Sequence, residues 1–411
     1  MAWVTDFHPT KAELTSCVQC GLCLPHCPTY RLTGRDTASP RGRLMAMSAV
    51  ASGELSVDES FAEIIDFCLQ CRACEAVCPS LVPFGRAMEG ARAEVTAQLP
   101  DSKRRLRHLL VGKALPNPAL MRLATWGMRL LRRFRLDRLL PATLSRPLSG
   151  VRRLDGAAPV RGTIRGPGRL GTAAVLAGCV MEPWFGDVQR ATVDLLSRAG
   201  YRVIVPENQT CCGALAAHDG DVVDARRLAR RNVDAFAGVD LVVATAAGCS
   251  AHLAEYGHWA PGGDDVARRS RDVTAVVADL IEQGHLPHIP GGRGPVAVQD
   301  PCHLRHAQRE TAAPRKILQA AGYATVDVDP SGMCCGAAGI YSLKYPEASA
   351  ELGTRKATEV EATGSTLVAS ANPGCEMQLR QHLPAWYRVA HPVEIYHEAL
   401  VESESRQTVR G

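Results

Sequence analysis

From residue 171 onward, short hydrophobic runs alternate with segments in which hydrophobic residues recur at helical spacing. The runs lie at 173–177, 201–205 and 241–245, and again at 296–298, 325–328 and 366–369. Helical spacing is clearest at 188–198 and around 316–321. Short buried strands that alternate with helices are typical of parallel sheets. We therefore predict two α/β units of similar layout in this part of the chain.

The segment 103–138 has an amphipathic and cationic pattern instead. It contains Lys103, Arg104, Arg105, Arg107, Lys113, Arg122, Arg129, Arg132, Arg133, Arg135 and Arg138 against one acid, Asp137. Leucines, Trp126 and Phe134 recur among them at helical spacing. Such helices either attach to a membrane surface or pack on the ferredoxin or a partner subunit with their arginines outward. The segment 150–171, rich in glycine, arginine and proline, predicts an exposed linker.

Length and composition favour a globular protein of several units. The chain has 411 residues, 46% of them hydrophobic, and a net charge of +5. No apolar stretch approaches the roughly 18 residues of a membrane-spanning helix, and the N-terminus lacks the pattern of a signal peptide. We expect a cytoplasmic protein, with at most a peripheral contact at the inner face of the cell membrane. No nucleic-acid-binding motif accompanies the charge.

Sixteen cysteines carry most of the functional information, and eight of them form two runs of the pattern Cys-x2-Cys-x2-Cys-x3-Cys-Pro. In the cytoplasm, cysteines at regular spacing are more often metal ligands or redox groups than disulfides. In the bacterial ferredoxin run, three thiolates hold one cubane and the fourth reaches the other cluster. We therefore predict two [4Fe–4S] clusters, the first on Cys17, Cys20, Cys23 and Cys78 and the second on Cys68, Cys71, Cys74 and Cys27. The 40 residues between the two runs favour a helical ferredoxin over the smallest β-rich type.

Zinc is the alternative occupant of these two runs, because Cys-x2-Cys pairs also suit tetrahedral zinc. Zinc chemistry does not require a third Cys-x2 step or the Cys-x3-Cys-Pro ending, and this chain has both features twice. The pattern therefore favours iron–sulfur clusters over zinc.

The other eight cysteines form an internal repeat. Cys302, Cys334 and Cys335 each lie 123 residues after Cys179, Cys211 and Cys212, and each copy ends in one more cysteine, Cys249 or Cys375. By the strand pattern they fall at or beyond the carboxyl ends of strands, where open α/β sheets place ligands. Four thiols in each copy could hold an additional iron–sulfur cluster or zinc, or remain structural or redox-active thiols. His252, His303 and His306 are further candidate ligands.

Taken together, these motifs resemble the iron–sulfur subunit family of bacterial glycolate oxidase over nearly the whole chain. The resemblance includes both cysteine runs, Pro40-Arg41-Gly42-Arg43, Cys211-Cys212-Gly213, Pro301-Cys302, Cys334-Cys335-Gly336 and Asn372-Pro373-Gly374-Cys375. It implies an α-helical two-cluster ferredoxin domain followed by two repeated α/β cysteine-rich domains with parallel sheets. The expected limits are 1–100 for the ferredoxin, 101–170 for the basic connector and linker, and 171–290 and 291–411 for the repeats.

The resemblance also implies electron relay as the function. An FAD-containing partner would oxidise glycolate or D-lactate, and electrons would pass through this chain to a quinone or another acceptor. We expect no catalytic residue and no FAD in this chain. The iron–sulfur subunits of anaerobic glycerol-3-phosphate and D-lactate dehydrogenases share the layout, and a zinc-stabilised scaffold is an alternative of another class. Related heterodisulfide reductase repeats end in Cys-x2-Cys, whereas this chain has His252 and Gln378 at the last position.

Overall fold

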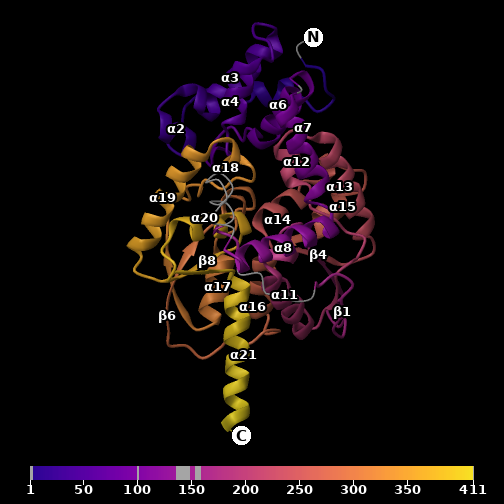
Figure 1. The fold of residues 1–411 in the computed structure, drawn as a ribbon, viewed down its shortest axis with the longest axis vertical. Helices are drawn as coiled ribbons and strands as arrows, with labels where there is room; N and C mark the ends of the chain where they lie inside the picture. The colour runs from indigo at the N-terminus through magenta and orange to yellow at the C-terminus, as the bar shows by residue number, and fades with distance from the viewer. Residues whose placement is uncertain (1–2, 100, 136–148, 153–158, 411) are drawn as a thin grey trace.

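The computed structural model describes residues 3–99, 101–135, 149–152 and 159–410. A helical N-terminal domain lies across one end, two α/β units lie side by side beneath it, and the C-terminal helix projects from the opposite end (Figure 1). This arrangement brings the N-terminal domain into contact with both units.

The N-terminal domain consists of helices with no strand among its described residues. Its elements are α1 (Lys11–Thr15), α2 (Pro28–Thr33), η1 (Asp36–Ala38), α3 (Pro40–Ser52), α4 (Glu59–Asp66), α5 (Ala73–Ala76) and α6 (Phe84–Gln98). The Ser39 side chain caps α3 by accepting from the Gly42 N–H, and Pro40 suits the first helical position. Met47, Ile65 and Met88 are fully buried between these helices. The prediction of a helical ferredoxin is confirmed.

The first α/β unit has five strands in the order β1-β3-β2-β4-β5. The strands are β1 (Ile164–Arg165), β2 (Thr172–Leu176), β3 (Arg202–Ile204), β4 (Leu241–Ala244) and β5 (Ser270–Asp272). The helical elements are α10 (Met181–Trp184), α11 (Gly186–Ala199), α12 (Ala214–His218), α13 (Val222–Ala235), α14 (Ala247–Leu253), η4 (Tyr256–His258), α15 (Gly263–Arg269) and α16 (Val273–Glu282). All pairings are parallel except that of β1 with β3.

The second α/β unit repeats the design with four parallel strands in the order β7-β6-β8-β9. The strands are β6 (Arg293–Gln299), β7 (Tyr323–Asp327), β8 (Leu367–Ser370) and β9 (Arg388–Ala390). The helical elements are η5 (His303–Ala307), α17 (Ala312–Ala320), α18 (Tyr341–Lys344), α19 (Pro346–Ala362), α20 (Pro373–His382) and α21 (Pro392–Arg410). The predicted fold class is confirmed. The three-residue strands β5 and β9 were not predicted, because each is too short to show a hydrophobic run.

The two units share one hydrophobic core on the side away from the N-terminal domain. Helices α11 and α16 of the first unit pack there with α17 and α21 of the second. Val393 and Tyr396 of α21 are fully buried in this core, and the Tyr396 hydroxyl donates to the Pro287 carbonyl at 2.6 Å. The helix at the end of the second unit therefore also stabilises the first.

The basic connector forms α7 (Ser102–His108), the π-helical η2 (Leu109–Ala114) and α8 (Pro118–Arg133). Helix α8 packs through Met121, Thr125 and Met128 on the first α/β unit, rather than on the ferredoxin as expected. The predicted outward arginines are only part of the exposed surface, because large apolar side chains also point to solvent. They are Leu106, Leu109, Leu110, Leu120, Leu123, Trp126, Leu130 and Phe134. Asp137 and Arg138 lie outside the described residues.

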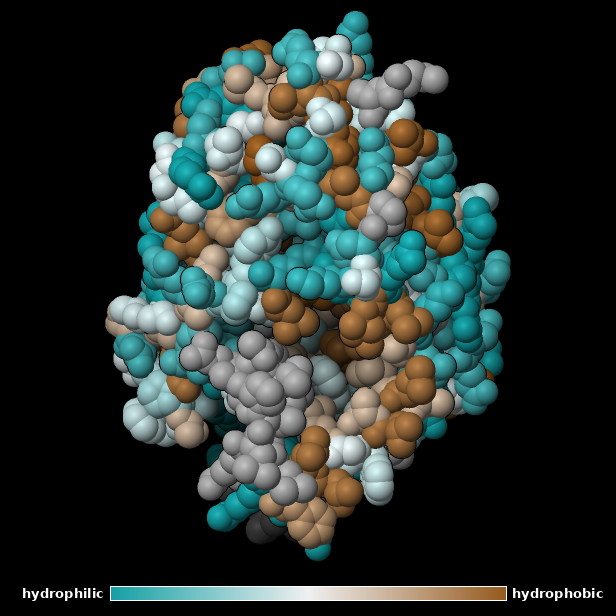
Figure 2. All heavy atoms as spheres, turned by 45° about the horizontal axis from the view of Figure 1, so that its top comes forward, coloured by the Kyte–Doolittle hydropathy of each residue, from teal (hydrophilic) through white to brown (hydrophobic). Residues whose placement is uncertain are grey.

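Hydrophobic residues gather beside a hollow in the middle of the molecular face shown in Figure 2. Within the described chain, the search for a helix long and apolar enough to cross a membrane finds none.

The expectation of an exposed linker over 150–171 is wrong at Arg152. This side chain is buried and forms ion pairs with Glu376 at 2.5 Å and with Glu394 at 2.7 Å. Ile164 and Arg165 add an antiparallel edge strand to the first sheet. The composition suggested a linker because glycine and proline are frequent in this segment. The ion pairs of the buried Arg152 with two carboxylates nevertheless fix the chain at this point.

Replacement of Arg152 by leucine should destabilise the protein by about 3–5 kcal/mol, because two carboxylates would remain buried without their cation. The control is Arg388→Leu, since Arg388 and its partner Glu398 are each 48% exposed, and an exposed pair contributes about 0–1 kcal/mol. Urea unfolding followed by circular dichroism compares the two variants. Equal shifts of the two midpoints would contradict the role assigned to Arg152.

Candidate iron–sulfur centres

The sixteen cysteines are all free thiols, and the structure gathers them into four sets of four. Cys17, Cys20, Cys23 and Cys78 line one cleft of about 40 Å³ together with Cys74. Cys20 is exposed and the other three of this set are half-buried. This set, called the outer ferredoxin set below, therefore lies at the protein surface.

Two turns of the same conformation present the ferredoxin cysteines. Gln19 and Gln70 occupy equivalent positions and have positive φ angles of 57° and 50°, and Gly21 and Arg72 follow the next cysteine at 79° and 62°. Left-handed conformations in close succession turn the chain sharply, which lets neighbouring cysteines point to one side. Arg72 is an unusual residue for this conformation. Its guanidinium pairs with Glu75 at 2.6 Å and with Glu255, and these ion pairs hold the turn.

The second ferredoxin set, Cys27, Cys68, Cys71 and Cys74, is buried. Burial raises the pKa of the Cys71 and Cys74 thiols well above the usual value, and the neighbouring Cys27 sulfur contributes in the same direction. Cys27 thus lies near the second run of cysteines, although it belongs to the first in sequence. Thiols with so raised a pKa would remain protonated without a metal, so positive charge from iron suits this set.

In the first α/β unit, Cys179, Cys211, Cys212 and Cys249 follow β2, β3 and β4 in the chain. The Cys212 thiol lies 3.2 Å from the Cys249 sulfur. Hydrogen bonds from Cys179 and Cys212 lower the pKa of Cys211 well below the usual value. A thiolate stabilised in this way is the form of cysteine that binds metals.

In the second unit, Cys302, Cys334, Cys335 and Cys375 are arranged in the same way. Hydrogen bonds from Cys334 and Cys375 lower the pKa of Cys335. The Asn372 amide donates to the Cys375 sulfur at 3.6 Å, and the Cys302 sulfur lies 3.6 Å from His303 Nδ1. All these cysteines follow strands, as the sequence predicted.

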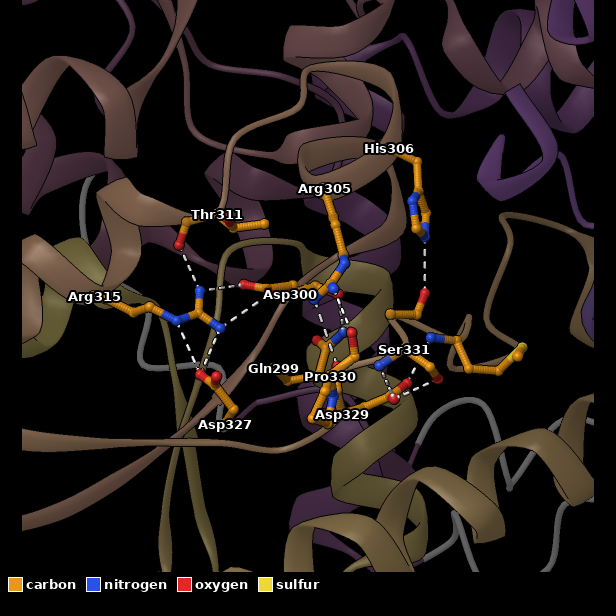
Figure 3. Close-up of polar contacts among 12 residues, drawn as sticks. Gln299, Asp300, Arg305, His306, Thr311, Arg315, Asp327, Asp329, Pro330 and Ser331 are labelled. Atoms are coloured by element: carbon orange, nitrogen blue, oxygen red, sulfur yellow. Dashed lines mark hydrogen bonds and ion pairs between the residues drawn. The ribbon is translucent and has the colours of Figure 1, made fainter. Parts of the chain in front are cut away.

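A polar network holds the loops that carry the cysteines of the second unit (Figure 3). Asp300 accepts from Arg305 at 3.1 Å and from Arg315 at 2.9 Å, which fixes the segment around Cys302. Asp329 accepts from the Ser331 N–H at 2.8 Å and pairs with Lys356 at 2.5 Å. The pKa of Asp329 is lowered to about 2, against the effect of burial, by its hydrogen bonds to Lys356 and Ser331. His306 is engaged here with the Gly332 carbonyl at 2.9 Å.

The four sets lie next to one another in a definite order. Cys71 of the buried ferredoxin set packs in one small core with Cys302 and Cys334 of the second unit. The cysteine-bearing helices α14 and α20 of the two units begin close together, since the N–H of Ala247, the first residue of α14, donates at 3.1 Å to the carbonyl of Ala371, two residues before α20. The segments that bear the buried ferredoxin set, the second-unit set and the first-unit set are therefore in contact with one another.

The donor chemistry of all four sets fits iron–sulfur clusters. Each set offers four thiols and no competing carboxylate ligand, and adjacent cysteines such as Cys211 and Cys212 can serve two irons of one cluster. Within the described residues, no three histidine, cysteine, aspartate or glutamate side chains are arranged to hold a single metal ion. The fit therefore depends on the grouping and spacing of the thiols, which suit a cluster of several irons.

His252 and Gln378 occupy equivalent positions in the two repeats but have different surroundings. Gln378 is engaged with Ser349, whose carbonyl accepts from it at 2.9 Å. Both ring nitrogens of His252 are buried without a hydrogen-bond partner among the described residues. Burial lowers the pKa of His252 to about 3, so its imidazole is neutral. The two repeats therefore differ at the position where related repeats carry a further cysteine.

A buried polar cluster between the three domains was not identified from the sequence. Its members are Gln70, Arg72, Glu89, His218, His252, Glu255 and His303, which surround a cavity of about 10 Å³. The His218 and His303 rings stack with centroids 5.5 Å apart, and His218 Nδ1 lies 3.0 Å from a Glu89 oxygen. These residues lie in three separate parts of the chain, so no local spacing indicated the cluster. The sequence signal was that Gln70, Arg72, His252 and His303 each lie close to a cysteine.

Comparison with known proteins identifies the same succession of a ferredoxin domain and two cysteine-rich domains. A family model described as a 4Fe-4S dicluster domain matches residues 13–82, and one described as a cysteine-rich domain matches residues 173–254 and 296–380. The chain is similar to the "Probable glycolate oxidase iron-sulfur subunit" of Bacillus subtilis, at 32% identity over 95% of this chain and 94% of that protein. It is also similar to the "Glycolate oxidase iron-sulfur subunit" of Escherichia coli, at 32% identity over 94% of each chain. The "Lactate utilization protein A" of Shouchella clausii is 28% identical over 54% of this chain and 95% of its own length.

The polar cluster should make stability depend on pH through Glu89. Burial raises the pKa of this carboxyl from 4.5 to about 7. A carboxyl with a raised pKa in the folded state disfavours folding increasingly as pH rises from 4.5 to 7. Glu89→Gln should therefore raise the melting temperature more at pH 8 than at pH 5.5. Anaerobic scanning fluorimetry measures this difference, and Glu361→Gln at an exposed position is the control. An equal change of Glu89→Gln at both pH values would show that Glu89 does not titrate in this range.

Proposed function

Because the chain belongs to the family of glycolate oxidase iron–sulfur subunits, we propose that it relays electrons from an FAD-containing partner that oxidises glycolate or D-lactate. The electrons pass to a quinone or another acceptor. The chain is thus the iron–sulfur subunit of an oxidoreductase complex, and oxidation of the hydroxyacid belongs to the partner.

The contact between the segments that bear the thiol sets is the observation that carries this proposal. A relay needs one redox centre near the surface to receive electrons and further centres spaced through the interior. The outer ferredoxin set supplies the surface position through the exposed Cys20. The buried set then leads to Cys302 and Cys334 in the second unit.

We propose two [4Fe–4S] clusters in the ferredoxin domain, the first on Cys17, Cys20, Cys23 and Cys78 and the second on Cys68, Cys71, Cys74 and Cys27. Such clusters, when bound, take up and release single electrons. The thiolates hold the iron, the left-handed turns at Gln19 and Gln70 aim them, and the helices around the second set exclude water. We also assign additional iron–sulfur clusters to the two repeat sets. The sets are Cys179, Cys211, Cys212 and Cys249 in the first unit and Cys302, Cys334, Cys335 and Cys375 in the second.

The domain limits and the location follow the same proposal. We assign residues 1–100 to the ferredoxin, 101–170 to the connector and 171–290 and 291–411 to the repeats. We propose that the chain lies in the cytoplasm, with the connector on the inner face of the cell membrane. The exposed apolar and cationic side chains of α8 support that contact.

Analysis of metal content tests the proposal against a zinc-stabilised scaffold. The anaerobically purified complex should contain iron and labile sulfide, with about eight irons in the ferredoxin domain. Low-temperature EPR of the reduced protein should show interacting cubane signals. Zinc without labile sulfide would contradict electron relay. The substrate of the purified complex distinguishes glycolate from D-lactate and from glycerol 3-phosphate.

Replacement of Cys20 by serine should interrupt the relay at its surface end. The complex should lose turnover with an external acceptor, because the outer ferredoxin cluster lacks one thiolate, while substrate still reduces the flavin of the partner. Stopped-flow absorbance of the flavin and steady-state acceptor reduction measure the two steps separately. Ser56→Ala, at an exposed position outside the thiol sets, is the control. Full turnover of the Cys20 variant would remove Cys20 from the relay.

A further inference from the structure

A cavity of about 290 Å³ lies between the connector helix α8 and the first α/β unit. Cys179 is part of its lining, so a molecule in this cavity would contact a residue of the last thiol set. Further lining residues include Pro116, Met121, Arg129, Pro183 and Trp184. The volume is near the lower end of the range of small-molecule pockets, roughly 300–1,000 Å³.

The walls of this cavity are about half polar and half apolar, and the apolar part includes the aromatic ring of Trp184. Trp184 is held in place by its indole N–H, which donates to the Thr125 hydroxyl at 3.1 Å. Thr125 in turn donates to the Met121 carbonyl at 2.7 Å. The donors of Trp184 and Thr125 are therefore occupied within the protein. The indole and the neighbouring methionine and prolines offer a surface on which a flat ring can stack.

One polar donor in the cavity is left without a partner. Arg161 pairs with Glu182 at 2.7 Å and Arg190 pairs with Asp187 at 2.5 Å. Arg129 Nε, in contrast, is buried and has no hydrogen-bond partner among the residues that the structure describes. A buried donor without a partner is costly, unless a ligand supplies the acceptor. The free donor therefore fits a carbonyl oxygen of a ligand.

The face of α8 that does not line the cavity carries exposed apolar side chains. Leu120, Leu123, Trp126 and Leu130 are exposed on the helix that forms one wall of the cavity. Figure 2 shows hydrophobic residues gathered beside a hollow on one face of the molecule. Arg122 is exposed on the same helix, and a cation among apolar side chains suits an interface with anionic lipid. A ligand with an apolar tail could thus reach the cavity from a membrane surface.

We propose that this cavity binds the ring of a membrane quinone and is the site where electrons leave the chain. This inference rests on the proposed relay, because it requires a cluster on the Cys179 set. Each quinone takes up two electrons, one at a time, from the reduced cluster, which is oxidised. Two protons from water at the cavity mouth join the two carbonyl oxygens and give the hydroquinone. Arg129 donates a hydrogen bond to one of these oxygens and thereby positions the ring beside Cys179.

Two matched arginine variants test the site in the complete complex with its flavin partner. Arg129→Gln removes the charged donor in the cavity, whereas Arg133→Gln removes a similar charge about one turn further along α8, outside the lining. Arg129→Gln should raise the KM for a short-chain, water-soluble quinone about tenfold. The Arg133 variant should keep the KM of the wild type. Iron and sulfide content should be unchanged in both, as should reduction of a dye that takes electrons directly from the flavin.

A second measurement is independent of turnover and of the flavin partner. In the dithionite-reduced chain, a redox-inactive quinone analogue should change the EPR signal of the cluster nearest the cavity in the wild type and in Arg133→Gln, but not in Arg129→Gln. An unchanged KM in Arg129→Gln, equal KM changes in both variants, or an analogue without effect on the wild-type signal would each overturn the site. If substrate fails to reduce the clusters while the analogue still changes the EPR signal, the result contradicts the proposed electron relay and supports the quinone-binding site.

Discussion

The structure depends on the close approach of thiols that share a site. Four sulfurs that face one another repel when ionised, and burial makes ionisation costly, so a metal or extensive hydrogen bonding must compensate. The ferredoxin domain meets this constraint with paired left-handed turns at Gln19 and Gln70. The α/β units meet it with the carboxyl ends of parallel strands, where Cys212 and Cys249 lie 3.2 Å apart. Left-handed turns in a helical domain and loops at the ends of parallel strands thus both bring cysteine side chains close together.

Ion pairs and buried contacts then keep the thiol sets next to one another. Arg72 pairs with Glu255 and thereby joins the ferredoxin turn to the first unit. Lys344 of the second unit pairs with Asp66 at 3.3 Å and with Asp219 at 2.8 Å, so it links all three domains. Lys344 is partly removed from solvent, and this burial lowers its pKa. The contacts between domains therefore fix the spacing of the candidate redox centres as well as stabilising the fold.

Much of this organisation could be predicted from the sequence, since cysteine spacing and hydrophobic runs are local properties. The helical ferredoxin, the repeat and the longer strands of both sheets were predicted in this way. The polar cluster around Glu89 and His218 was not predicted, because its members become neighbours only when three domains pack together. Arg152 was misjudged for a similar reason. Glu376 and Glu394 lie more than 200 residues away in sequence, and the local composition contains no sign of them.

The core shared by α11, α16, α17 and α21 has a consequence for how this protein can change in evolution. The two repeats arose from one pattern, yet the last helix of the second now fills the core of the first. Neither half could be inherited alone without exposing Val393, Tyr396 and the surfaces that they cover. Recombination that exchanges one repeat between relatives would have to carry the matching helix faces with it. The two repeats must therefore change together at the helix faces of their shared core, even though each retains its own four thiols.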